Sequence, residues 1–223
     1  MDFAHVDVWI FDLDNTLYPP QMALFPQIET RMTAYVMRLL QLRRDEADRL
    51  RRDWWRQHGT TLAGLMAEHA IDPLDYLAEV HDIDFTGLAP APELSAAIEA
   101  LPGRKLVHTN GDSTYARKVL AARGLGMFEA VYGIEETGFR PKPARAAFEA
   151  VLRMAAIDPR RAAFFEDDPR NLVAPHDMGM RTVLVGPPRH GPDTGAALPG
   201  CDAIPHVDHR IDDLVAFLRA IAL

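Results

Sequence analysis

The chain has 223 residues, of which 48% are hydrophobic and 25% are charged, as in ordinary soluble globular proteins that bury a sizeable apolar core. Its net charge of −8 argues against a nucleic acid polymer as partner, because such surfaces carry a basic excess. Cys201 is the only cysteine, which favours a reducing, cytoplasmic setting, and no apolar run has the length of a membrane span, so we expect no membrane association.

The first predicted strand covers residues 8–11, an uncharged run of β-branched and aromatic residues between Asp7 and Asp12. Pro19 and Pro20 then end regular structure, since proline lacks a backbone N–H and constrains the residue before it. From residue 24 to residue 88, apolar residues recur three and four positions apart, as in amphipathic helices. This pattern predicts a helical insert of roughly 70 residues after the first strand.

Short apolar strands alternate with helices after the insert. The predicted strands are 106–109, 130–132, 162–165 and 182–185, and the predicted helices are 93–101, 114–123, 144–156, one opening at Pro169, and 211–221. Residues 186–210 are rich in Gly, Pro and Asp and predict a loop. The alternation indicates an α/β fold, a Rossmann-like parallel sheet with helices on both faces. We expect residues 1–17 and 92–223 to form this core and residues 18–91 to form a helical cap.

Two aspartates, Asp12 and Asp14, directly follow the first predicted strand. Residues two apart in an extended chain point to the same side, so the two carboxylates would lie close together. Such a pair is tolerable with a divalent cation between the charges, or with one carboxyl protonated and acting as an acid. The alternative, a carboxylate that only supports a turn, accounts for one of the two aspartates.

Polar clusters also follow two later predicted strands, at residues 109–112 and 166–168, and Lys142 lies between prolines. The carboxyl ends of parallel strands converge at one edge of the sheet, so these residues would meet the two aspartates there. Magnesium prefers oxygen ligands, and carboxylates of Asp12 and Asp167 with a backbone carbonyl near Asp14 would suffice beside water and phosphate. The combination predicts a magnesium and phosphate site.

The same residue types suit phosphoryl transfer. An aspartate in line with phosphorus can form an acyl phosphate, and Asp14 would protonate the leaving oxygen and then activate water. Thr109, with the backbone N–H groups of Asn110 and Gly111, would hold phosphoryl oxygens, and Lys142 would offset their charge. We therefore expect a small phosphorylated metabolite as the partner.

These residues form four ordered motifs that resemble those of the haloacid dehalogenase superfamily of phosphohydrolases. The motifs are Asp12-Leu13-Asp14-Asn15-Thr16, Thr109-Asn110-Gly111, Lys142-Pro143 and Phe165-Glu166-Asp167-Asp168. The insert resembles the C1 cap of that superfamily. The run from Asp14 to Tyr18 and the set Asp167, Asp168 and Asn171 are similar to pyrimidine 5'-nucleotidases.

The resemblance implies that Asp12 is the nucleophile, Asp14 the general acid and base, and Asp167 a metal ligand. It implies further that Thr109 and Lys142 bind phosphate, and that Glu166 or Asp168 supports the metal indirectly. Dehalogenases proper lack the second aspartate of the first motif, so Asp14 favours phosphate transfer. The expected activity is magnesium-dependent phosphate monoester hydrolysis through phospho-Asp12, on a pyrimidine nucleoside monophosphate. The alternatives are a sugar-phosphate phosphatase or phosphomutase, and a phosphate-binding regulatory module without turnover.

Several conspicuous residues have structural interpretations instead. The arginine-rich stretch 43–56 is interleaved with acidic residues and indicates a solvated, ion-paired helix face rather than an anion-binding surface. Trp54 and Trp55 are interpreted as cap packing, although one of them could stack on a substrate base. We expect His108 to be a packed core histidine and Asp112 to cap the following helix.

Overall fold

The computed structural model describes residues 3–186 and 204–222. Its strands form one sheet in the order β3-β2-β1-β4-β5-β6, and every neighbouring pair is parallel. The strands are β1 (Val8–Phe11), β2 (Arg104–His108), β3 (Ala130–Tyr132), β4 (Ala162–Glu166), β5 (Arg181–Val185) and β6 (His209–Ile211). β1 and β4 lie at the centre, so their carboxyl ends, which carry the first and the last acidic motifs, are neighbours.

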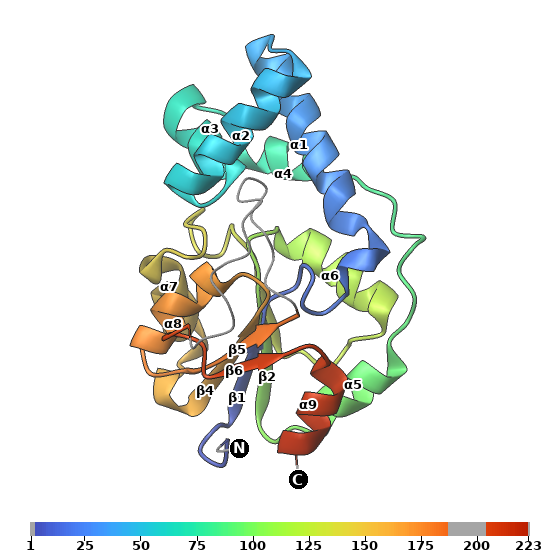
Figure 1. Cartoon of the computed structure of the whole chain (residues 1–223), viewed down its shortest axis with the longest axis vertical. Coiled ribbons are helices and arrows are strands. Elements are labelled where there is room, and N and C mark those ends of the chain that lie inside the picture. The colour runs from blue at the N-terminus through green and yellow to red at the C-terminus, as the bar shows by residue number, and fades with distance from the viewer. Residues whose placement is uncertain (1–2, 187–203, 223) are drawn as a thin grey trace.

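Helices cover both faces of this sheet (Figure 1). The described helices are α1 (Leu24–Leu40), α2 (Arg44–His58), α3 (Thr61–His69), α4 (Pro73–Val80), α5 (Pro92–Glu99), α6 (Ser113–Arg123), α7 (Arg145–Ala155), α8 (Val173–Asp177) and α9 (Leu214–Ile221), and those that pack on the sheet are α5 to α9. Successive strand residues point to opposite faces, and so β1 contributes Trp9 and Phe11 to one apolar cluster with α5, α6 and α9. Val8 and Ile10 join the other cluster, with α7 and α8. The predicted α/β fold is confirmed.

Helices α1 to α4 group beyond the carboxyl ends of the strands (Figure 1). Arg38 of α1 donates two hydrogen bonds of 2.8 and 2.7 Å to Glu79 of α4. Trp54 of α2 is fully buried against α3, where a Cβ at Gly64 would lie 2.1 Å from the indole ring. A glycine there is therefore needed for the close approach of the two helices. We refer to α1–α4 as the cap; that residues 18–91 form a cap domain separate from a core of residues 1–17 and 92–223 stays a prediction.

A buried arginine joins the two chain segments that connect α1–α4 to the sheet. Arg123, at the end of α6, donates to the carbonyl oxygen of Leu17 at 3.4 Å and to that of Ala89 at 2.5 Å. Its own carbonyl oxygen accepts a hydrogen bond of 2.9 Å from the N–H of Ala91. Both connections are thus tied to one helix end of the core.

The structure differs from the predicted elements near the C-terminal end. β6 begins inside the predicted loop 186–210, and its last residue, Ile211, belongs to this strand and not to the final helix, which begins at Leu214. β6 is short, only partly buried and contains His209 and Arg210, so no apolar run marks it. The helix predicted to open at Pro169 begins as a 3₁₀ turn, Pro169–Leu172, before α8. Loop residues 187–203 lie outside the described residues.

None of the described helices is both long and apolar enough to span a membrane.

Candidate active site

Asp12 is held at the carboxyl end of β1 by the sheet itself. Its N–H donates to the carbonyl oxygen of Phe165 at 2.9 Å, which continues the β1–β4 pairing one residue past the strand. The side chain is 7% exposed and lines a cavity of about 1110 Å³ between the sheet edge and α1–α4. Asp12 therefore presents its carboxylate to the cavity from the end of a central strand.

Lys142 is buried against Asp12, although 130 residues separate them. Its ammonium donates to Asp12 Oδ1 at 2.6 Å, to Glu166 Oε2 at 2.7 Å and to the carbonyl oxygen of His108 at 3.0 Å. Burial by itself lowers the pKa of Lys142, but the charges of Asp12 and Glu166 outweigh it and hold the pKa above its ordinary value. The side chain is a permanent cation and satisfies all three of its donors.

The backbone at Lys142 is fixed from two sides. Asn110 accepts a hydrogen bond of 2.8 Å from the N–H of Lys142 and donates one of 3.1 Å to its carbonyl oxygen. On the other side the turn after α2 lies close by, and a Cβ at Gly59 would lie 3.3 Å from that carbonyl oxygen. The side chain of Asn110 thus positions Lys142, a contact that sequence reasoning did not anticipate.

Thr109 and Gly111 form a tight turn after β2. The Thr109 hydroxyl accepts a hydrogen bond of 3.0 Å from the N–H of Gly111, and Thr109 is 1% exposed. Asn110, Gly111 and Lys142 line the cavity, whereas Thr109 is not among the described residues that line it. Direct phosphate contact by Thr109 stays a prediction.

Three carboxylates gather beside this lysine. Asp12, Glu166 and Asp167 are all buried, and each offers an oxygen within 4.8 Å of the others. With a single ammonium among them, burial and the charge of Glu166 raise the pKa of Asp12 to about 8. The carbonyl-type oxygen Oδ1 of Asn171, which also lines the cavity, is buried without a hydrogen-bond partner in the described chain.

Such a donor set suits a magnesium ion, which prefers hard oxygen ligands and would offset the excess negative charge. Asp12 and Asp167, both expected as ligands, belong to the cluster, and Glu166 joins them while also binding Lys142. The carboxylate of Asp14 is not part of the cluster, and its part in holding the metal, expected through a backbone carbonyl, stays a prediction. Asp168 instead accepts hydrogen bonds from the backbone and side chain of Arg170.

Asp14 lines the cavity in a turn that follows Asp12. Asn15 adopts a left-handed conformation with φ 64°, which asparagine tolerates well, and the turn brings Tyr18 back towards Asp14. Tyr18 and Tyr115 donate hydrogen bonds of 2.5 and 2.7 Å to Asp14 Oδ1. No sequence motif indicated Tyr115, which lies on α6.

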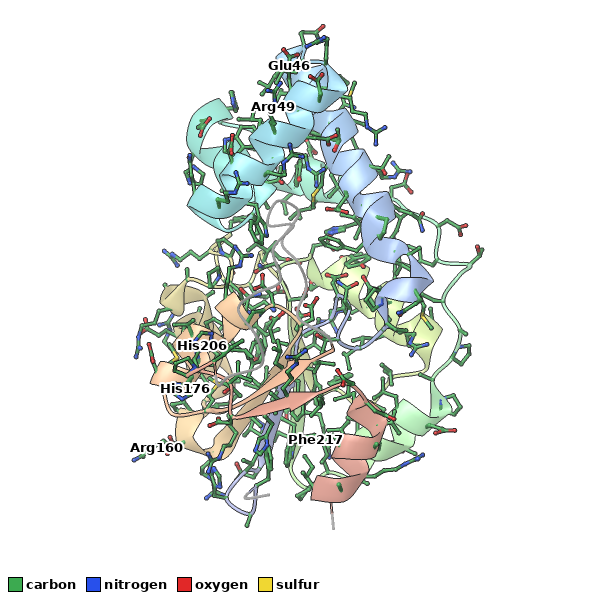
Figure 2. The ribbon with its side chains drawn as sticks, in the orientation of Figure 1. Glu46, Arg49, Arg160, His176, His206 and Phe217 are labelled. Atoms are coloured by element: carbon green, nitrogen blue, oxygen red, sulfur yellow. The ribbon has the colours of Figure 1, made fainter. Side chains whose placement is uncertain are left out.

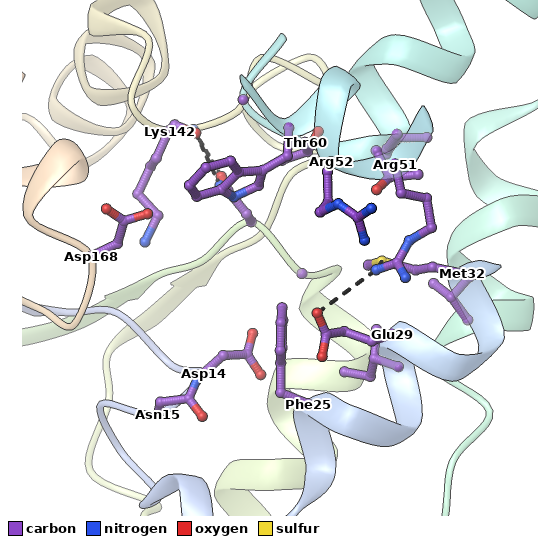
Figure 3. Close-up of a pocket in the computed structure, with 18 of the residues that line it drawn as sticks. Asp14, Asn15, Phe25, Glu29, Met32, Arg51, Arg52, Thr60, Lys142 and Asp168 are labelled. Carbon is purple, nitrogen blue, oxygen red and sulfur yellow. Dashed lines mark hydrogen bonds and ion pairs between the residues drawn. The ribbon is translucent and has the colours of Figure 1, made fainter. Parts of the chain in front are cut away.

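The cavity wall opposite Asp14 and Lys142 comes from α1 and α2 (Figure 3). Arg51 lies 3.9 Å from Glu29 and donates to the Thr33 hydroxyl at 2.5 Å. Its side chain is only 14% exposed, against 64% for Arg49 on the same helix, and Figure 2 shows Arg49 at the far end of the cap. The predicted solvated arginine face is therefore correct for Arg49 but wrong for Arg51, which faces the cavity.

The remaining interpretations are confirmed in part. His108 is 1% exposed, and burial together with Lys142 lowers its pKa well below the ordinary value. Asp112 caps α6 by accepting from the N–H of Tyr115 at 2.7 Å. Trp54 is core packing, but Trp55 lines the cavity with the guanidinium of Arg170 3.3 Å above its ring. That cation–π contact joins the cap to the turn after Asp168.

A family model described as haloacid dehalogenase-like hydrolase matches residues 6–179, which span the cap and the four motifs. The chain belongs to this hydrolase family. Solved structures support the fold of this haloacid dehalogenase-like hydrolase over almost its whole length. CbbY from Rhodobacter sphaeroides, solved with phosphate, has a TM-score of 0.61 at 15% identity and covers 92% of this chain and 93% of its own.

Two further solved structures are similar to this chain in fold. The putative hydrolase YfnB from Bacillus subtilis, bound to magnesium, has a TM-score of 0.58 at 18% identity and covers 97% of this chain and 98% of its own. The 2-haloacid dehalogenase from Pseudomonas syringae pv. Tomato DC3000 has a TM-score of 0.56 at 20% identity, with the same coverage. At these identities the likeness is one of fold.

Proposed function

We propose that this hydrolase cleaves phosphate monoesters with the help of magnesium, through a phosphoryl group carried on Asp12. The main support is the buried arrangement of Lys142 between Asp12 and Glu166, with Asp167 beside them, on the wall of a cavity that also contains Asp14. A bound magnesium ion would supply positive charge for the phosphoryl oxygens. The family alone does not give this activity, since it includes dehalogenases.

In the proposed reaction, the free carboxylate oxygen of Asp12 attacks phosphorus while the bond to the leaving oxygen breaks. Asp14 gives its proton to that oxygen, so the alcohol leaves neutral. Asp14 then takes a proton from water as the water attacks phosphorus, which releases phosphate and restores the Asp12 carboxylate. Lys142 stays protonated and offsets the charge that develops on the phosphoryl group.

The finer proposal is a pyrimidine nucleoside monophosphate as substrate. It is supported by the similarity of the run Asp14 to Tyr18 and of Asp167, Asp168 and Asn171 to pyrimidine 5'-nucleotidases. The cavity of about 1110 Å³ has room for a nucleotide, and Glu29, Thr33 and Arg51 offer acceptors and donors to a leaving group. A cytoplasmic setting, favoured by the single cysteine, belongs to the same proposal.

A phosphate-release screen tests the proposal. The panel contains nucleoside monophosphates, sugar phosphates and p-nitrophenyl phosphate, with 2-chloropropionate as the dehalogenase substrate and sugar-phosphate isomer formation as the mutase readout. We expect phosphate release only with magnesium, none with Asp12→Asn, and slow turnover with retained binding for Asp14→Asn. Chloride release without phosphatase activity, or phosphate binding with no turnover of any ester, would refute it.

A further inference from the structure

The side chain of Asp14 is held by two tyrosines that the proposed chemistry does not use. Tyr18 and Tyr115 are each 1% exposed, and both donate to the same oxygen, Oδ1. Each tyrosine has a single hydroxyl hydrogen. When both hydroxyl hydrogens are directed at Asp14, the 3.2 Å separation of the two hydroxyl oxygens is a contact without a hydrogen bond. Burial, followed by the charge of Asp14, raises the pKa of both tyrosines, so they remain donors.

Tyr115 is itself fixed by residues from two other parts of the chain. Asp112 accepts from the N–H of Tyr115 at 2.7 Å and pairs with Nδ1 of His81 at 2.5 Å. The His81 ring, at the end of α4, stacks on the Tyr115 ring with centroids 4.4 Å apart and planes inclined by 8°. The hydroxyl of Tyr115 therefore has little freedom to move, and the last cap helix contributes to fixing it.

We infer that Tyr18 and Tyr115 are positioning residues that assign different tasks to the two oxygens of Asp14. This inference rests on the proposed function of Asp14 as acid and base. Oδ1 accepts from the two hydroxyls whether the carboxyl is ionised or protonated, because a protonated carboxyl still has a carbonyl oxygen. Oδ2 is then the oxygen of this cavity-lining residue that carries the proton. A freely rotating carboxyl would present its proton to the leaving oxygen only part of the time.

The test compares esters that differ in their need for an acid. A p-nitrophenolate ion leaves without protonation, whereas an alkoxide does not, so kcat/KM for an alkyl phosphate depends on a well-placed proton. For Tyr18→Phe and Tyr115→Phe we expect kcat/KM for the best alkyl phosphate of the panel to fall about 10- to 100-fold, and that for p-nitrophenyl phosphate by less than about 3-fold. Tyr132→Phe, remote from Asp14 on β3, is the control and should match the unsubstituted protein.

A double substitution separates positioning from general structural damage. Because the tyrosines act through Asp14, Tyr115→Phe should cause no further loss of kcat/KM for the alkyl ester in the Asp14→Asn background. Equal losses for the two esters, or a further loss in that background, would overturn the inference while leaving the phosphatase activity established. If the unsubstituted protein hydrolyses neither ester, the proposed function is refuted and the inference with it.

Discussion

Replacing Lys142 by methionine removes the only cation found between Asp12 and Glu166 in the described structure while keeping an unbranched side chain of similar length. Three hydrogen bonds of 2.6, 2.7 and 3.0 Å are lost together. Removal of one partner from a buried ion pair costs about 3–5 kcal/mol, because the remaining charge stays buried and unpaired. We expect a loss of this size in the free energy of unfolding, and loss of phosphatase activity.

The loss should depend on pH in one direction. Lys142 lowers the pKa of Asp12, which burial and Glu166 nevertheless raise from 3.8 to about 8, so the variant has a still higher Asp12 pKa. Above about pH 8 the folded variant then keeps a proton that the unfolded chain does not bind, and its stability falls as pH rises. The deficit relative to the unsubstituted protein should thus be larger at about pH 9 than at about pH 7.

Urea unfolding in the presence of a chelator measures these differences, with Lys118→Met on the exposed face of α6 as the matched control. A second substitution, Glu166→Gln, should recover about 0.5–3 kcal/mol in the methionine background, since it removes one of the crowded carboxylates. It should not recover activity. An unchanged free energy of unfolding, or a deficit that shrinks as pH rises, would refute the electrostatic account of Lys142.

Three further predictions concern the metal, the cap connections and acid stability. Magnesium should stabilise the protein by about 2.7 kcal/mol at 100 times its Kd, and Asp167→Asn should abolish most of the shift in a thermal melt; an equal shift in that variant would exclude Asp167 as a ligand. Arg123→Met should loosen the connections at Leu17 and Ala89, seen as faster amide exchange there and a raised KM; unchanged exchange would contradict this role. Because the pKa of His108 is lowered on folding, only the unfolded chain gains its proton below about pH 6.5, so stability should fall by up to about 1.4 kcal/mol per pH unit as pH decreases. His108→Phe should remove that part of the slope in urea unfolding, and an identical slope would show that His108 does not titrate differently in the two states.

The sequence by itself determined most elements and the residues of the four motifs. Apolar residues at three- and four-residue spacing marked α1, and a short apolar run before Asp12 marked β1, because these patterns reflect burial of one face of a helix or of a whole strand. β6 was not predicted, because its three residues lie at the edge of the sheet and join it through backbone hydrogen bonds, without the apolar run that marks a buried strand.

Only the tertiary structure decided which residues surround the motif side chains. Tyr115 reaches Asp14 from 101 positions away, and Asn110 holds the backbone of Lys142 through its amide. Arg51 faces the cavity while Arg49, two positions earlier, faces solvent, a difference set by how α2 packs and not by composition. Such contacts depend on how whole helices and strands pack. Sequence motifs therefore identify the candidate reacting residues, whereas the tertiary structure determines which side chains hold them in position.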